Sequence, residues 1–123
     1  MGVVRVLLVD DQPEVLRVVA AIVDETAGFV VVAEAASGEA ALVAAATTHP
    51  DLVLMDVNLP GIDGVEATRR LLREDAPPVV ILLSTYDEDA GERFVAESGA
   101  VRYLTKSVFG PECLADAWAA VAD

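Results

Sequence analysis

The sequence has little positive charge, a single cysteine and no long hydrophobic run. Its 123 residues include 8 Lys and Arg against 21 Asp and Glu, which gives a net charge of -13. Because Lys and Arg supply the affinity for phosphate backbones and anionic lipids, this balance argues against direct contact with nucleic acid or a membrane surface. Cys113 has no second cysteine with which to form an internal disulfide, which fits a reducing cytoplasm. No uncharged run approaches the roughly 18 residues that indicate a membrane-spanning helix.

What the sequence does contain is a regular series of short apolar runs. They occupy residues 5–9, 29–33, 52–55, 79–83 and 101–104. Runs without alternation are typical of strands buried on both faces of a parallel sheet. The longer segments between them have helical spacing, as with Val15, Val19 and Val23. The composition of 54% hydrophobic and 24% charged residues excludes a disordered chain. The sequence therefore predicts one α/β domain over residues 1–123, built on a doubly wound parallel sheet of five strands with five helices.

Prolines, an aspartate and a glycine mark the expected helix ends. Pro13 and Pro111 suit a first helical turn, where the missing N–H is not needed. Asp63 and Glu66 have the spacing of a capping box. Gly99 lies where a helix should stop before the next strand.

Two further glycines bear on the helices. Gly28 also lies where a helix should end. Gly91 falls inside the helix expected over residues 88–97, where it should cost about 1 kcal/mol relative to alanine. We therefore expect that helix to be short or labile.

Polar residues stand at the ends of four of the five predicted strands. They are Asp10 and Asp11, Asp56, Ser84 and Thr85, and Thr105 and Lys106. In open parallel sheets ligands bind outside these carboxyl ends. Three carboxylates brought together there would repel, and a hard divalent cation such as Mg²⁺ relieves that repulsion with oxygen ligands. A carboxylate beside Mg²⁺, an ammonium and a hydroxyl has the chemistry needed to accept a phosphoryl group.

Each of these residues also has a simpler interpretation. Asp10 and Asp11 could cap the next helix, Asp56 could open a turn, and Lys106 could be a solvated surface lysine. Taken singly, each structural role competes with the functional one. The joint placement on four strand ends favours function.

The same residues form part of a longer set of motifs. These are Leu7-Leu8-Val9-Asp10-Asp11, Asp51-Leu52-Val53-Leu54-Met55-Asp56, Leu59-Pro60-Gly61-Ile62-Asp63-Gly64, Leu83-Ser84, Gly99-Ala100 and Tyr103-Leu104-Thr105-Lys106. With them the chain resembles, from about Arg5 to Val121, the receiver domain of bacterial two-component response regulators. The resemblance implies a flavodoxin-like fold with strand order 2-1-3-4-5.

The resemblance also implies a role for each acidic residue. Asp56 matches the aspartate that is phosphorylated in this family. Asp10 and Asp11 match the acidic pair that holds Mg²⁺ with Asp56 and the main-chain carbonyl of Asn58. Ser84 stands where the family often has threonine, and it keeps the hydroxyl that turns toward the phosphoryl group.

Two further residues complete the implied site. Lys106 matches the lysine that contacts the phosphoryl oxygens, and Tyr103 matches the aromatic switch that moves inward. The implied partner is a sensor histidine kinase, and the receiver itself is expected in the cytoplasm. The receiver would catalyse only its own phosphorylation and dephosphorylation, and it is therefore not expected to be an enzyme of metabolism.

The output of such a switch is left open between two alternatives. The run from Leu83 to Asp87 and the Lys106-Ser107 pair are closest to receivers of the NarL/LuxR type, which precede a helix-turn-helix DNA-binding domain absent from this chain. A stand-alone receiver acting through protein contacts is the alternative. A homodimer formed on phosphorylation is compatible with either.

Two rival functions come from other classes of protein. A Mg²⁺-dependent phosphatase with an aspartyl nucleophile would carry Asp-x-Asp after the first strand, whereas Asp10 and Asp11 are adjacent. A flavin-binding module would need a glycine- and hydroxyl-rich phosphate loop there, and Asp10-Asp11 would repel a phosphate. Turnover of a phosphomonoester would support the first, and a yellow chromophore the second.

Three remaining residues are expected to be structural. His49 precedes Pro50 at the end of a predicted helix, where it suits a surface or capping role. Cys113 and Trp118 fall on or beside an apolar helical stripe, where core packing is the common role.

Overall fold

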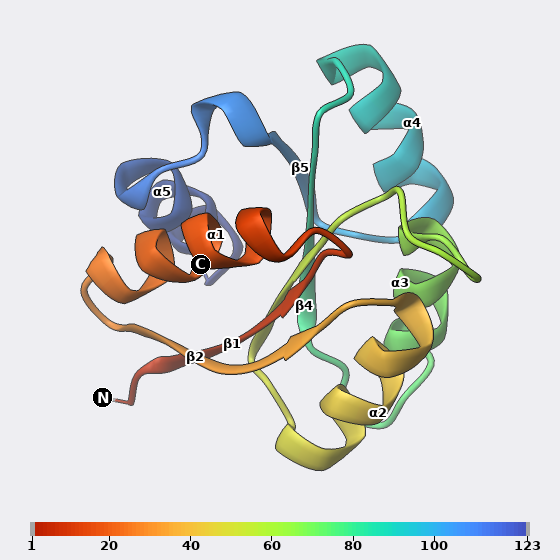
Figure 1. The fold of residues 1–123 in the computed structure, drawn as a ribbon, viewed down its shortest axis with the longest axis horizontal. Helices are drawn as coiled ribbons and strands as arrows, with labels where there is room; N and C mark the ends of the chain where they lie inside the picture. The colour runs from red at the N-terminus through yellow and green to blue at the C-terminus, as the bar shows by residue number, and fades with distance from the viewer. Residues whose placement is uncertain (1, 123) are drawn as a thin grey trace.

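The computed structural model describes residues 2–122, and one parallel sheet organises them (Figure 1). Its strands are β1 (Val4–Val9), β2 (Phe29–Ala35), β3 (Leu52–Met55), β4 (Val79–Ser84) and β5 (Arg102–Thr105). They lie in the order β2-β1-β3-β4-β5, with every neighbouring pair parallel. Each strand begins and ends within two residues of its predicted bounds, and the predicted strand order is confirmed.

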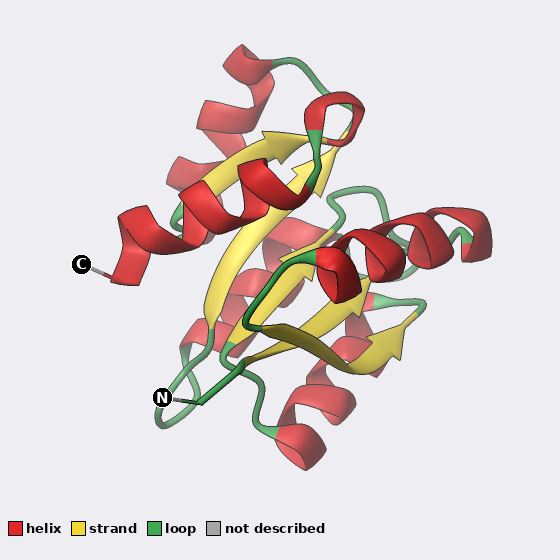
Figure 2. Cartoon of the chain, turned by 90° about the vertical axis from the view of Figure 1, so that its left-hand side faces the viewer, coloured by secondary structure: helices red, strands yellow, loops and turns green. Residues whose placement is uncertain are grey.

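Helices cover both faces of this sheet (Figures 1 and 2). They are α1 (Pro13–Glu25), α2 (Gly38–Thr48), α3 (Gly64–Leu72), α4 (Glu88–Ser98) and α5 (Pro111–Ala122), with a short 3₁₀ turn at Lys106–Val108. Alternate residues of β1 enter opposite cores: Leu7 and Val9 pack under α2, α3 and α4, whereas Val6 and Leu8 pack under α1 and α5. The doubly wound α/β class is therefore confirmed. No helix of the described residues is long and apolar enough to cross a membrane.

The prolines and Asp63 mark helix ends as predicted, except for one half of the capping box. Pro13 and Pro111 are the first residues of α1 and α5, as predicted. The Asp63 side chain caps α3 by accepting from the Glu66 main-chain N–H at 2.9 Å. In a capping box the Glu66 carboxylate would also accept from the Asp63 N–H. This half of the prediction is wrong, because the carboxylate pairs with Arg70 at 2.9 Å and Arg69 at 3.3 Å. These two guanidinium groups lower the pKa of Glu66.

The glycine predictions have mixed outcomes. Gly99 caps α4 in the left-handed conformation, with φ 88°. Gly28 also has φ 88°, but α1 already ends at its C-cap Thr26. The helix that contains Gly91 spans 11 residues, as many as α2, so the expectation of a short helix is wrong. Its lability stays a prediction.

The three residues expected to be structural have structural surroundings. His49 is the C-cap of α2, with φ 49°. Cys113 is half-buried beside the core under α1 and α5. Trp118 packs against the same core and meets the Phe29 ring edge-on, with ring centroids 6.4 Å apart.

Two buried threonines offer a matched test of hydrogen bonding inside the protein. The hydroxyl of Thr26 donates to the Ile22 carbonyl at 2.6 Å, whereas the fully buried hydroxyl of Thr68 has no hydrogen-bond partner among the described residues. Thr68→Val removes an unsatisfied buried group, so we expect it to raise the free energy of unfolding by about 1 kcal/mol. Thr26→Val breaks a made bond and should lower that free energy by about the same amount. Urea denaturation followed by circular dichroism measures both changes. A loss of stability in Thr68→Val would contradict the conclusion that the Thr68 hydroxyl lacks a hydrogen-bond partner.

Candidate functional site

The parallel register brings four strand ends to one edge of the sheet. Val9 of β1 pairs with Met55 of β3, so Asp10 and Asp56, the next residues, leave the sheet side by side. The Asp56 N–H donates to the Val9 carbonyl at 3.0 Å, which fixes this alignment. On the other side, β4 ends at Ser84, which pairs with Thr105 of β5, and Lys106 follows. The sheet thus presents two acids, a hydroxyl and an ammonium at neighbouring positions.

The side chains at this edge form a connected polar cluster. Lys106 Nζ lies 2.7 Å from Asp10 Oδ2 and 3.5 Å from Asp56 Oδ2. Ser84 Oγ donates to Asp56 Oδ1 at 2.9 Å. Both carboxylate oxygens of Asp56 are therefore engaged, one by a hydroxyl and the other by an ammonium. Asp10 also accepts from the Gln12 N–H at 2.9 Å, so it shapes the turn before α1 as well as joining the cluster.

Burial sets the electrostatics of this cluster. Asp10 is 4% exposed and Asp56 is 5% exposed, whereas Asp11 lies at the surface. Burial raises the pKa of Asp56, and the charge of Asp10 acts in the same direction. The Lys106 ammonium and the Ser84 hydroxyl oppose this rise by favouring the carboxylate.

The acidic residues fit a divalent cation. One carboxylate oxygen from each of Asp10, Asp11 and Asp56 lies within 4.8 Å of the others. The donor set is oxygen alone and carries more negative charge than Lys106 balances, which is the environment that Mg²⁺ prefers. Asn58, the further predicted ligand, lies exposed two residues beyond Asp56.

Gly64 holds the Asp56 main chain in place. It is the first residue of α3, and its N–H donates to the Val57 carbonyl at 2.8 Å. A Cβ on Gly64 would overlap the Asp56 carbonyl oxygen and would lie 2.9 Å from Val57 Cα. In the sequence Gly64 stands only as the last residue of the motif that begins at Leu59, whereas the structure shows that its missing side chain lets α3 begin directly against the Asp56 main chain.

The predicted switch residue Tyr103 lies beside the cluster without entering it. Its hydroxyl donates to the Tyr86 carbonyl at 2.6 Å, and burial raises the pKa of its phenol. Tyr86 in turn donates its own hydroxyl to Asn58 Oδ1 at 2.8 Å. Sequence reasoning did not single out Tyr86, although it lies in the run from Leu83 to Asp87 and two residues beyond the end of β4. It links the loop after Asp56 to Tyr103.

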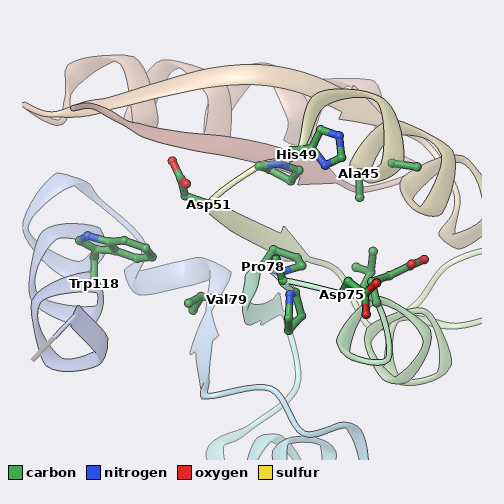
Figure 3. A pocket seen from close by; sticks show the side chains of 13 residues that line it. Ala45, His49, Asp51, Asp75, Pro78, Val79 and Trp118 are labelled. Atoms are coloured by element: carbon green, nitrogen blue, oxygen red, sulfur yellow. The ribbon is translucent and has the colours of Figure 1, made fainter.

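A separate cavity of about 660 Å³ opens at the opposite edge of the sheet (Figure 3). It lies at the ends where β3 and β4 begin, and Asp51, Val79 and Trp118 are among the residues that line it. None of the polar cluster lines this cavity. The strand ends, and not this cavity, hold the residues that the sequence predicted.

Comparison with known proteins identifies the family. Residues 6–118 match the response regulator receiver domain. The chain belongs to this family. The predicted resemblance is therefore confirmed, and with it the assignment of the receiver to two-component signalling.

Individual relatives agree with this placement. Response regulator GacA of Pseudomonas viridiflava is 41% identical over 103 residues, which make up 84% of this chain and 48% of that protein. Transcriptional regulatory protein LiaR of Bacillus subtilis is 37% identical over 114 residues, or 93% of this chain and 54% of that protein. The crystal structure of a LuxR-family two-component response regulator from Aurantimonas sp. SI85-9A1 covers 98% of this chain and 85% of that one, with 34% identity and a TM-score of 0.86. The receiver spans about half the length of the curated relatives.

The contact between Gly64 and Asp56 predicts a costly substitution. Gly64→Ala should lower the free energy of unfolding by about 1–3 kcal/mol, because main-chain atoms cannot swing aside as a side chain can. Gly38→Ala is the matched control: Gly38 is also the first residue of its helix, but its Cβ would overlap only the Ile62 side chain, 2.6 Å from Cγ1, and would lie 3.0 Å from the nearest main-chain atom, the Ile62 carbonyl oxygen. Chemical denaturation of both variants tests this, and equal costs would contradict the special role of Gly64.

Proposed function

We propose that the receiver is a phosphorylation switch in which Asp56 accepts the phosphoryl group. The observation that carries this proposal is the double engagement of the Asp56 carboxylate by Ser84 Oγ at 2.9 Å and Lys106 Nζ at 3.5 Å. A hydroxyl and an ammonium aimed at one buried carboxylate are also suited to hold the oxygens of a phosphoryl group bonded to it.

The proposed reaction transfers a phosphoryl group from a phosphohistidine of a sensor kinase. A carboxylate oxygen of Asp56 attacks phosphorus and forms an O–P bond while the P–N bond to histidine breaks. The imidazole leaves with the bonding electrons and takes up a proton. Lys106 neutralises charge on the transferring oxygens, and hydrolysis by water later returns inorganic phosphate and the free carboxylate.

Asp10, Asp11 and Asp56, with the main-chain carbonyl of Asn58, would hold Mg²⁺ in this proposal. The ion would supply positive charge against the phosphoryl oxygens. The support is the oxygen-only donor set within 4.8 Å and its excess of negative charge.

The conformational response begins at Ser84. Its hydroxyl now donates to Asp56, and phosphoryl oxygens offer it a more strongly charged acceptor. As Ser84 turns, the connection between β4 and α4 follows, and Tyr103 moves with it because its hydroxyl is bound to Tyr86. The surface made by α4, β5 and α5 is then biased toward a second arrangement.

The output is proposed from the relatives. GacA and LiaR are named as regulators, LiaR as a transcriptional one, and the receiver spans about half of each. We therefore favour a cytoplasmic protein in which this receiver controls a helix-turn-helix DNA-binding domain. A homodimer formed on phosphorylation is compatible with this output. The net charge of -13 is unsuited to DNA contact by the receiver itself. A stand-alone receiver is the second candidate.

Phosphoryl transfer is tested by intact mass after incubation with Mg²⁺ and acetyl phosphate. The wild type should gain one phosphoryl group, and Asp56→Asn should gain none because the amide is not a comparable nucleophile. Asp75→Asn removes an exposed acid far from the cluster and should label normally. Undiminished labelling of Asp56→Asn would refute the assignment. Steady release of phosphate from a phosphomonoester would favour the rival phosphatase.

Cation binding is tested by thermal unfolding with and without Mg²⁺. At ten times its Kd, a ligand that binds only the native state adds about 1.4 kcal/mol to the free energy of unfolding. We expect Mg²⁺ to raise the Tm of the wild type and of Asp75→Asn, and to raise that of Asp11→Asn far less. Asp11 is the exposed member of the cluster, so its replacement leaves the buried pairs with Lys106 intact. Equal shifts in all three proteins would remove Asp11 from the site.

A further inference from the structure

Gly91 of α4 lies directly against the ring of Tyr103 on β5. Gly91 is buried, and its N–H donates to the Asp87 carbonyl at 2.9 Å in the first turn of the helix. A Cβ on Gly91 would overlap Cγ and Cδ2 of Tyr103 and would lie 2.7 Å from Cε2, closer than real Cβ atoms approach their neighbours. The ring therefore occupies the space that any side chain at position 91 would need.

The other end of Tyr103 is also held. Its hydroxyl donates to the Tyr86 carbonyl at 2.6 Å. The Tyr86 ring packs edge-on against Phe94 of α4, with centroids 5.0 Å apart and planes at 72°. Gly91 and the Tyr86 carbonyl together form what we call the Tyr103 seat, a half-buried position between α4 and the segment that follows β4.

Local preferences do not account for a glycine at this position. Alanine is the better helix former, because glycine loses more backbone entropy on folding. Gly91 has an ordinary helical hydrogen bond and no positive φ, so its own backbone does not require glycine. The contact with the Tyr103 ring is what requires glycine at position 91.

We propose that Gly91 is a positioning residue for Tyr103: its missing side chain admits the ring to the seat and so joins α4 to β5. The role in signalling rests on the proposed function of Tyr103 as the switch. If phosphorylation of Asp56 favours the ring in the Tyr103 seat, phosphorylation and the position of the ring are linked. A side chain at position 91 would fill the seat and uncouple the ring from phosphorylation.

A double-mutant cycle tests the seat without any phosphorylation. Gly91→Ala should lower the folding equilibrium constant by about tenfold or more in the wild-type background, as overpacking does. In the Tyr103→Ala background the clash is gone, and Gly91→Ala should then raise that constant through helix propensity. Glu97→Ala, at an exposed position of the same helix, is the control and should have the same effect in both backgrounds.

Each result of this cycle decides the proposal. Opposite signs of the Gly91→Ala effect in the two backgrounds support it. Stabilisation in both backgrounds, or equal destabilisation in both, overturns it, because the ring would not then be what excludes a side chain at position 91. If Gly91→Ala does not fold alone, the proposal requires that adding Tyr103→Ala rescues folding, and failure of that rescue also overturns it.

Fluorine NMR then reports on the surroundings of the Tyr103 ring directly. The chain has 2 tyrosines, so 3-fluorotyrosine should give two resonances, which Tyr86→Phe and Tyr103→Phe assign. We expect Gly91→Ala to shift the Tyr103 resonance toward its position in unfolded protein. With acetyl phosphate and Mg²⁺, Asp56 of this variant should still gain a phosphoryl group while the Tyr103 resonance no longer responds. An unchanged Tyr103 resonance in Gly91→Ala, or a wild-type response to phosphorylation in that variant, overturns the proposal.

The two proposals fail in distinguishable ways. If the wild type gains no phosphoryl group, the function of Asp56 is in question, whereas the folding cycle and the unphosphorylated spectrum still test the seat. If the wild type is labelled and its Tyr103 resonance responds equally in Gly91→Ala, the switch stands and Gly91 has no part in it.

Discussion

Repulsion among carboxylates at one edge of the sheet is the constraint on which the rest of the site depends. Asp10 and Asp56 are almost fully buried, and Asp11 brings a third charge within 4.8 Å. Lys106, the sole lysine of the chain, reaches both buried acids. Buried charges of one sign are tolerated only when opposite charge compensates them. The single ammonium compensates part of the excess, and the remainder makes the edge receptive to a cation.

The sheet and the membership of this cluster could be predicted because they depend on local signals. Continuous apolar runs define strands that are covered on both faces, and the residue after a strand is fixed by where the run stops. In a parallel sheet all these stops lie at one edge, so Asp10, Asp56 and Lys106 could be placed together without knowledge of any distance. The register of β1 with β3 and of β4 with β5 turns that expectation into contacts.

Contacts between side chains on different elements could not be predicted in this way. Glu66 has the spacing of a capping box, yet two arginines one helical turn away compete successfully for its carboxylate. Tyr86 bonds Asn58 and Tyr103 because the loops after β3 and β4 come together, which no local pattern encodes. Gly91 was judged by helix propensity alone, a local quantity that takes no account of the ring packed against it.

Gly64 and Gly91 have the same physical role at the starts of two helices. Each lies in the first turn of a helix, where a side chain would collide with a group of the proposed switch: the Asp56 main chain in one case and the Tyr103 ring in the other. Glycine lets a helix backbone approach such a group closely, at a cost in helix propensity. Helices α3 and α4 therefore touch Asp56, the proposed acceptor, and Tyr103, the proposed switch, through their backbones, which move less freely than side chains. In the proposed switch, a shift of the Asp56 main chain would therefore be passed to α3 and a shift of the Tyr103 ring to α4, as a switch with a distant output requires.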